Sequence, residues 1–147
     1  MQTAYRYFVS LVFVSVMLAA CSKGGTDTTG GGGGGPHFDS PQDTTAPGVI
    51  INTPVPDQVY TSGNIMNVTG RITDDLGLYR GTIRITNDAN GTLVKEQQYE
   101  IHGLLAYNFN ITYTTGVTII SDYTVKVTFE DHGLNTASKS VKVKVNP

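Results

Sequence analysis

Hydrophobic and polar residues alternate with a period of two through most of the chain after residue 43. That period is typical of β-strands with one buried and one exposed face, and residues that favour turns interrupt it about every eight to twelve positions. No stretch has the 3.6-residue apolar period of an amphipathic helix. The pattern predicts an all-β sandwich of two antiparallel sheets, with about seven strands near residues 48–53, 64–73, 80–87, 92–101, 107–114, 122–130 and 137–145.

Two of these strands carry the marks of a sheet edge. Pro54 and Pro56 follow the strand at 48–53, and proline cannot donate a hydrogen bond to a neighbouring strand. The more polar strand at 92–101 carries Lys95 and Glu96, whose charges discourage pairing with a foreign chain. We therefore expect both strands at edges.

The N-terminal 20 residues have the organisation of a signal peptide. Arg6 supplies a positive charge, and residues 7–20 then run without any charge. This run is shorter than the roughly 20 apolar residues that a membrane-spanning helix needs. We interpret residues 1–20 as a signal peptide rather than as a permanent transmembrane anchor.

The sequence Leu18-Ala19-Ala20-Cys21 resembles the lipobox of bacterial lipoproteins. The resemblance implies cleavage before Cys21, diacylation (palmitate) of its sulfur and acylation of the new amino terminus, which together give a stable membrane anchor. The alternative is ordinary secretion with an incidental cysteine, but the single cysteine of the chain falls where a lipoprotein requires it. Ser22 fits the outer membrane of Gram-negative cells, so we expect a lipid-anchored envelope protein on its periplasmic or surface side.

Residues 21–42 separate this anchor from the alternating region. After Cys21 the segment contains eight glycines and one large apolar residue, Phe38, so it predicts a disordered, flexible linker. His37 could in principle bind a metal, but a single linker histidine is more often simply solvated. Residues 43–147 then form one domain of a size that can bury its own core.

Composition narrows the range of functions. Without Arg6 the chain carries nine basic and twelve acidic side chains, so no basic surface is expected to bind nucleic acid. The absence of tryptophan weakens the case for a sugar-stacking platform. The chain lacks a nucleophile elbow, a zinc-protease motif and a phosphate-binding loop, and only His102 and His132 could act as bases in the domain. We expect no enzymatic activity.

Three stretches resemble the Ig-like modules of bacterial surface and secreted proteins: Asp43-Thr44-Thr45-Ala46-Pro47, the segment 68–78 (VTGRITDDLGL) and the segment 122–136 (DYTVKVTFEDHGLNT). The resemblance covers most of residues 43–147 and implies an Ig-like sandwich, with Tyr123 in the structural position of a tyrosine corner. It does not specify a ligand.

Two acidic loops have similar sequences, Asp75-Leu76-Gly77-Leu78 and Asp131-His132-Gly133-Leu134. An Ig-like sandwich would place both loops at the end where the first strand begins. Nearby carboxylates repel unless a cation bridges them, and Ca²⁺ takes six to eight oxygen ligands. The candidate calcium ligands are Asp43, Asp74, Asp75, Glu130 and Asp131. The alternative is that these residues only form turns, and His132 likewise could bind a metal, sense pH or do neither.

The sequence therefore predicts a non-catalytic binding or adhesion module for a protein or a glycan. A second interpretation is a structural subunit that docks by adding a strand to a larger envelope complex, and a third is a small hydrolase. Candidate contact residues are Tyr60, Tyr79 and the pair Leu104-Leu105. Core packing is the alternative for each, and we favour it for the leucines.

Overall fold

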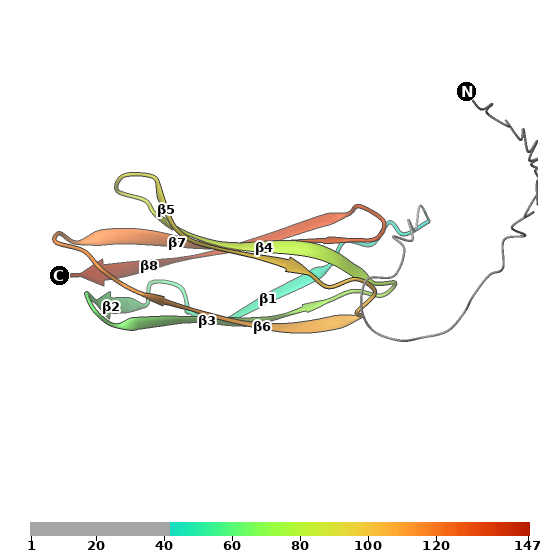
Figure 1. Cartoon of the computed structure of the whole chain (residues 1–147), viewed down its shortest axis with the longest axis horizontal. Helices are drawn as coiled ribbons and strands as arrows, with labels where there is room; N and C mark the ends of the chain where they lie inside the picture. Colours follow the sequence, from blue (N-terminus) through green and yellow to red (C-terminus); the bar gives the residue numbers. More distant parts are fainter. Residues whose placement is uncertain (1–41) are drawn as a thin grey trace, which may run out of the picture. The chain divides into compact units, whose positions relative to one another are not determined.

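The computed structural model describes residues 42–147, and all eight of their strands belong to one sandwich (Figure 1). The predictions for the signal peptide, for Cys21 and for His37 fall outside the described residues. No helix among the described residues has the length and hydrophobicity to cross a membrane. The strands are β1 (Gly48–Thr53), β2 (Val59–Thr61), β3 (Ile65–Thr73), β4 (Leu78–Asn87), β5 (Thr92–Glu100), β6 (Ala106–Thr114), β7 (Ser121–Asp131) and β8 (Thr136–Asn146).

The strands form a three-stranded sheet, β1-β3-β6, packed on a five-stranded sheet, β2-β8-β7-β4-β5. Neighbouring strands are antiparallel except β2 and β8, which run parallel. The predicted all-β sandwich is confirmed, and both predicted edge strands, β1 and β5, are outermost in their sheets. The alternation predicted seven strands, whereas the fold has an eighth, the three-residue strand β2.

The core is made by the inward faces that the alternation predicted. In β7, Tyr123, Val125, Val127 and Phe129 are all buried, while the residues between them reach toward solvent. Tyr123 is a core residue: it is buried and accepts a hydrogen bond at 3.3 Å from the side-chain amide of Asn87 on β4. A shift of one residue in register would expose this row of apolar side chains to water, so the register of the pairing is well specified.

Antiparallel pairing places the loops at two opposite ends of the sandwich. The proximal end, where the described chain begins, contains residues 42–47, 74–77, 101–105 and 132–135. The distal end contains residues 62–64, 88–91 and 115–120 together with the C-terminal Pro147. Figure 1 shows the C terminus at the end away from the proximal loops.

Candidate functional site

Three of the five candidate calcium ligands meet at the proximal end. Asp43, Asp74 and Asp75 each place one carboxylate oxygen within 4.8 Å of the others. Asp43 precedes β1, whereas Asp74 and Asp75 follow β3, and the pairing of Gly48 with Thr73 brings the two segments together. The expected convergence of acidic residues is thus present for these three.

Asp43 is held in place from two sides. Its Oδ1 accepts a hydrogen bond from the backbone N–H of Thr45 at 3.0 Å, and the side-chain amide of Asn135 donates to its backbone carbonyl at 3.0 Å. Gly133 lies so close that a Cβ at that position would approach the Asp43 carbonyl oxygen to 2.6 Å. Asp43 is 4% exposed, yet its Oδ2 has no hydrogen-bond partner.

The two carboxylate oxygens of Asp74 have different surroundings. Oδ2 accepts hydrogen bonds from the backbone N–H groups of Leu76 at 3.1 Å and Gly77 at 2.6 Å, as the turn-forming interpretation expects. Oδ1 is buried and has no hydrogen-bond partner. Two buried oxygens without donors, beside the exposed carboxylate of Asp75, suit the oxygen-rich coordination of a hard cation. The three residues could therefore hold a metal ion.

Glu130 and Asp131 lie outside this group of three. Glu130 Oε1 is 3.0 Å from the guanidinium Nη2 of Arg80 on the outer face of the five-stranded sheet. Asp131 is buried, and its two oxygens accept the backbone N–H of Asn135 at 2.9 Å and the side-chain amide of Asn135 at 3.0 Å. Asp131 acts as a turn residue here, and it orients Asn135, which in turn holds Asp43.

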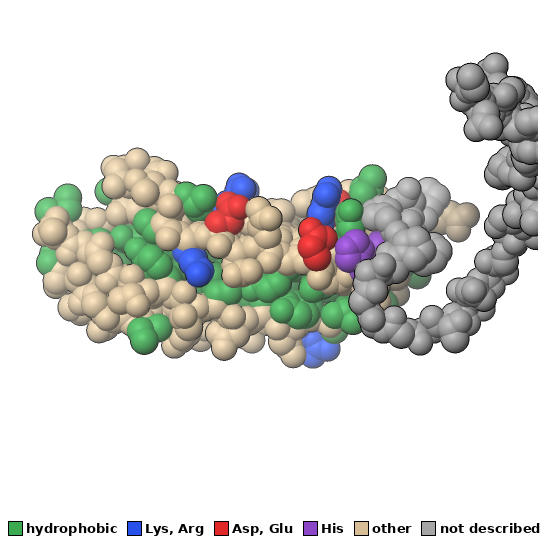
Figure 2. Space-filling view, in the orientation of Figure 1, with side chains coloured by type: hydrophobic (Ala, Val, Ile, Leu, Met, Phe, Trp, Pro, Cys, Tyr) green, Lys and Arg blue, Asp and Glu red, His purple; other side chains and the backbone are tan. Residues whose placement is uncertain are grey.

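Two histidines and a tyrosine pack together at the proximal end, where Figure 2 shows histidine side chains in purple next to acidic and basic ones. The ring of Tyr79 lies 4.8 Å from that of His102 and 5.1 Å from that of His132, measured between centroids. The Arg80 guanidinium lies over Tyr79 at 4.8 Å, and His102 Nε2 is 3.4 Å from the Glu100 carboxylate. Contact between the two histidines could not be predicted, because His102 lies in neither of the two acidic loops that were expected to meet.

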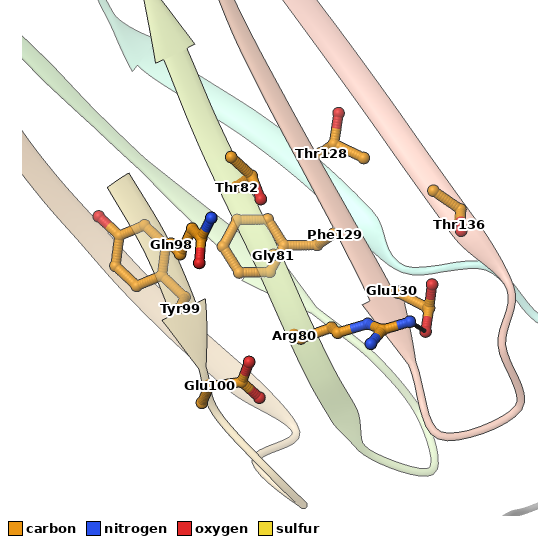
Figure 3. Close-up of a pocket in the computed structure, with 10 residues that line it drawn as sticks. All are labelled: Arg80, Gly81, Thr82, Gln98, Tyr99, Glu100, Thr128, Phe129, Glu130 and Thr136. Atoms are coloured by element: carbon orange, nitrogen blue, oxygen red, sulfur yellow. Dashed lines mark ion pairs between the residues drawn. The ribbon is translucent and has the colours of Figure 1, made fainter. Parts of the chain in front are cut away.

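A shallow polar hollow of about 300 Å³ lies on the outer side of the five-stranded sheet (Figure 3). The ion pair between Arg80 and Glu130 crosses it, and its other polar lining includes Thr82, Gln98 and Thr128. Its groups can form hydrogen bonds, but nothing in it pairs a nucleophile with a base.

A second hollow, of about 610 Å³, lies at the distal end. Asn87 and Asn90 supply amide groups, Thr118 a hydroxyl, and Val117 and Ile119 apolar surface. Ile119 and Ile120 are 68% and 62% exposed, the highest fractions among the large apolar side chains of the described residues. No sequence motif identified this site, because its lining comes from three loops between β2 and β7.

The candidate contact residues proposed from the sequence need two corrections. Tyr60 is buried with 8% exposure in β2, and burial raises the pKa of its hydroxyl, so it belongs to the core rather than to a contact surface. Leu104 and Leu105, for which core packing was favoured, are exposed instead. The third candidate, Tyr79, is half-buried against the histidines.

The sheet edges differ in how well they are protected. On β5, Glu96 forms an ion pair with Arg84, and hydrogen bonds from Gln98 and Arg84 lower the pKa of its carboxyl. The edge strand β6, in contrast, has no charged residue and no proline between Ala106 and Thr114. If a partner added a strand, β6 would oppose it less than β5 does.

The strand order defines the class of protein as an Ig-like β-sandwich. Strands β4, β7 and β8 form the centre of one sheet with β5 beside β4, and β1, β3 and β6 form the other. No protein-family model matches the chain, and no curated protein matches it in sequence.

Several solved structures resemble the chain at low sequence identity. The sporulation control protein Spo0M of Bacillus subtilis aligns with a TM-score of 0.46 and 11% identity over 69% of this chain and 49% of its own. The fibronectin(III)-like modules of Clostridium thermocellum CbhA align with a TM-score of 0.43 and 17% identity over 69% and 47%. A CARDB domain from Pyrococcus furiosus, in complex with di-metal ions, gives 0.41 and 17% over 69% and 96%. The chain spans about half the length of the first two.

Proposed function

We propose that this chain is a lipid-anchored binding module of the bacterial cell envelope and that it binds a protein partner at its distal end. The observation that carries the proposal is the exposure of Ile119 and Ile120 beside the distal hollow. Neighbouring apolar side chains that remain in water next to amide and hydroxyl groups are typical of contact surfaces for proteins.

The aromatic residues favour a protein over a glycan at this end. Sugar rings are commonly recognised by exposed aromatic faces, but Tyr60 and Tyr123 are buried, and the chain has no tryptophan. A glycan remains the second candidate for a different surface, the polar hollow of Figure 3. Its ion pair and hydroxyl groups could bind sugar hydroxyls by hydrogen bonds.

The proposed anchor is acylated Cys21, and Ser22 after it favours the outer membrane, with the protein facing the periplasm or the cell surface. The described chain begins at the proximal end, so the distal end would be the part farthest from the attachment. This arrangement supports a module that is fixed at one end and recognises a partner at the other.

We further propose that Ca²⁺ occupies the group formed by Asp43, Asp74 and Asp75. The two buried oxygens without partners support this choice, because a carboxylate pair is unfavourable there without a bound cation. Calcium would hold the segment before β1 against the loop after β3. Its role would be to stiffen the proximal end, with no part in catalysis.

The alternative of docking by strand addition is favoured by one observation, the uncharged edge of β6. A charged substitution there, Thr112→Lys, would abolish assembly if the alternative is correct. The same substitution would leave partner binding unchanged if the distal end is the contact surface.

The experiment has one part for the anchor and one for the contact. Mass spectrometry of the mature protein should find acyl chains on Cys21, and Cys21→Ala should release the protein from membranes. A photo-crosslinking residue at Ile119 should give, in intact cells, a discrete protease-sensitive adduct that Ile120→Glu removes. The matched control is the same crosslinker at Val55, which is exposed but outside the distal end. Equal adducts at both positions would contradict the proposed surface.

A further inference from the structure

Four leucines are exposed at the proximal end. They are Leu76 after β3, Leu104 and Leu105 before β6, and Leu134 between β7 and β8. Their exposed fractions lie between 46% and 61%. Single exposed apolar residues are common, but four exposed leucines in three loops at one end concentrate apolar side chains in one region, as contact sites do.

Hydrogen bonds join these three loops into one surface. The backbone N–H of Asp74 donates to Leu105 at 2.9 Å, and that of Leu78 donates to Leu104 at 2.9 Å. The backbone N–H of His132 donates to Gly77 at 3.1 Å. The leucines are therefore displayed by a connected framework.

Leu134 supplies a second observation. Its backbone has φ of 66°, in the left-handed region where Gly and Asn are preferred and a bulky side chain is uncommon. The local turn thus disfavours leucine, and the side chain gains no core contact in return because it is 61% exposed. A requirement for an apolar group at this surface would account for both facts.

The occupant of this surface is inferred from the proposed anchor and from the length of chain that joins it to the described domain. Twenty residues separate Cys21 from Gln42, where the described chain begins at the proximal end. Twenty residues span at most about 70 Å even when fully extended. Acyl chains on Cys21 would therefore keep the bilayer within reach of the leucines. Because the anchored protein has already lost its free translation, contact of the leucines with the bilayer would cost less entropy than it would for an unanchored protein.

We infer that the proximal end lies on the bilayer that anchors Cys21, with Leu76, Leu104, Leu105 and Leu134 inserted among the lipids. The inference rests on the proposed anchoring and adds an orientation to it. The carboxylates of Asp74 and Asp75 border the leucines, so in the absence of calcium anionic lipids would oppose contact and zwitterionic lipids would not. The distal end would then point away from the membrane.

The absence of tryptophan allows a direct test. In full-length acylated protein, Leu105→Trp places a single tryptophan at the proximal end, and Ile119→Trp places a matched one at the distal end. Both proteins are reconstituted in phosphatidylcholine vesicles that contain brominated lipids, which quench tryptophan on contact. We expect at least a twofold loss of fluorescence with a blue shift for Leu105→Trp, and neither change for Ile119→Trp. Equal quenching of the two would overturn the inference.

A second variant separates insertion from simple proximity. With a Trp reporter at Leu134, the double substitution Leu104→Glu and Leu105→Glu should abolish quenching while circular dichroism remains that of the folded domain. Persistent quenching would mean that the leucines do not drive contact, and the inference would fail.

Failure of the insertion proposal can be distinguished from failure of the proposed lipid anchor. If mass spectrometry finds no acyl chain on Cys21, the proposed anchoring is wrong. The thiol of Cys21, the only one in the chain, can then be coupled to a maleimide lipid, and the same quenching comparison repeated. Selective quenching at Leu105→Trp would still support insertion, and its absence would refute it.

Discussion

The Phe129 ring of β7 lies directly over Gly81 of β4, its partner across the strands (Figure 3). Gly81 faces inward with Ile83 and Ile85, so the missing side chain leaves room that the aromatic ring fills. Gly70 and Phe109 repeat the arrangement between β3 and β6. A glycine that weakens a strand is thus covered, once in each sheet, by the phenylalanine opposite.

This packing predicts that Gly81→Ala destabilises the fold. The added Cβ would overlap the Phe129 ring, and forcing extra atoms into a packed core costs about 1 to 3 kcal/mol. The free energy of unfolding in urea measures the loss. Gly116→Ala is the matched control, because no atom lies within 4 Å of its would-be Cβ. Equal free energies for the two variants would contradict the packing argument.

Calcium should raise the melting temperature of the protein. At a calcium concentration about tenfold above Kd, the free energy of unfolding would rise by about 1.4 kcal/mol, which raises the melting temperature by several degrees. Asp74→Asn should remove the response while an amide oxygen still caps the turn. In chelator, Asp74→Asn should melt higher than the natural protein, because it removes the charge from one of two neighbouring carboxylates that each have a buried oxygen without a hydrogen-bond partner.

The control for the metal prediction is Asp57→Asn, at an exposed carboxylate outside the acidic group. Asp57 has φ of 61°, a conformation that asparagine also tolerates, so the backbone should not change. If the natural protein melts at the same temperature in calcium and in chelator, the proposed calcium site is wrong.

Asn135→Ala should loosen the attachment of the segment before β1. The side-chain amide of Asn135 donates to both the Asp43 carbonyl and the buried Asp131 carboxylate, and leaving such an acceptor unpaired costs about 1 to 3 kcal/mol. We expect that loss in urea unfolding, together with faster hydrogen exchange at Thr45. Asn108→Ala, at an exposed position of β6, should change neither the free energy of unfolding nor the hydrogen exchange at Thr45.

Stability should fall at alkaline pH because of Tyr99. Burial, with a smaller contribution from Tyr107, raises the pKa of Tyr99 to about 12 from its ordinary value of 10.0. The folded state therefore keeps a proton that the unfolded state loses, so the contribution is complete below about pH 10 and disappears as pH rises toward 12. Urea midpoints measured across this range should decline more in the natural protein than in Tyr99→Phe. Parallel declines would show that Tyr99 is not the cause.

The fold was largely predictable because period-two alternation is direct evidence for half-buried strands. Strand β2 escaped prediction because three residues cannot display a period, and its pairing depends on β8, which lies more than 80 residues later. The same omission made Tyr60 look like a contact residue. The alternation of β7 already placed Glu130 on the outer face with Lys126 and Thr128, away from Asp43.

The site was only partly predictable, for physical reasons. Turn residues cluster at the ends of strands, so the sequence indicated which acidic groups could meet but not which oxygens would lack donors. The exposed leucines could not be recognised, because apolar residues beside a strand are usually core. Their exposure depends on how the loops hydrogen-bond to one another, which no local pattern records.

The parallel pairing of β2 with β8 has a mechanical consequence. A pull toward the membrane would enter the domain at Gln42 and reach β2 through β1, while a partner at the distal end would pull the opposite way near the end of β8. The two strands would then be drawn past each other along their length. Their hydrogen bonds would carry the load together instead of opening one after another, so a domain anchored and bound as proposed would resist being stretched between the membrane and its partner.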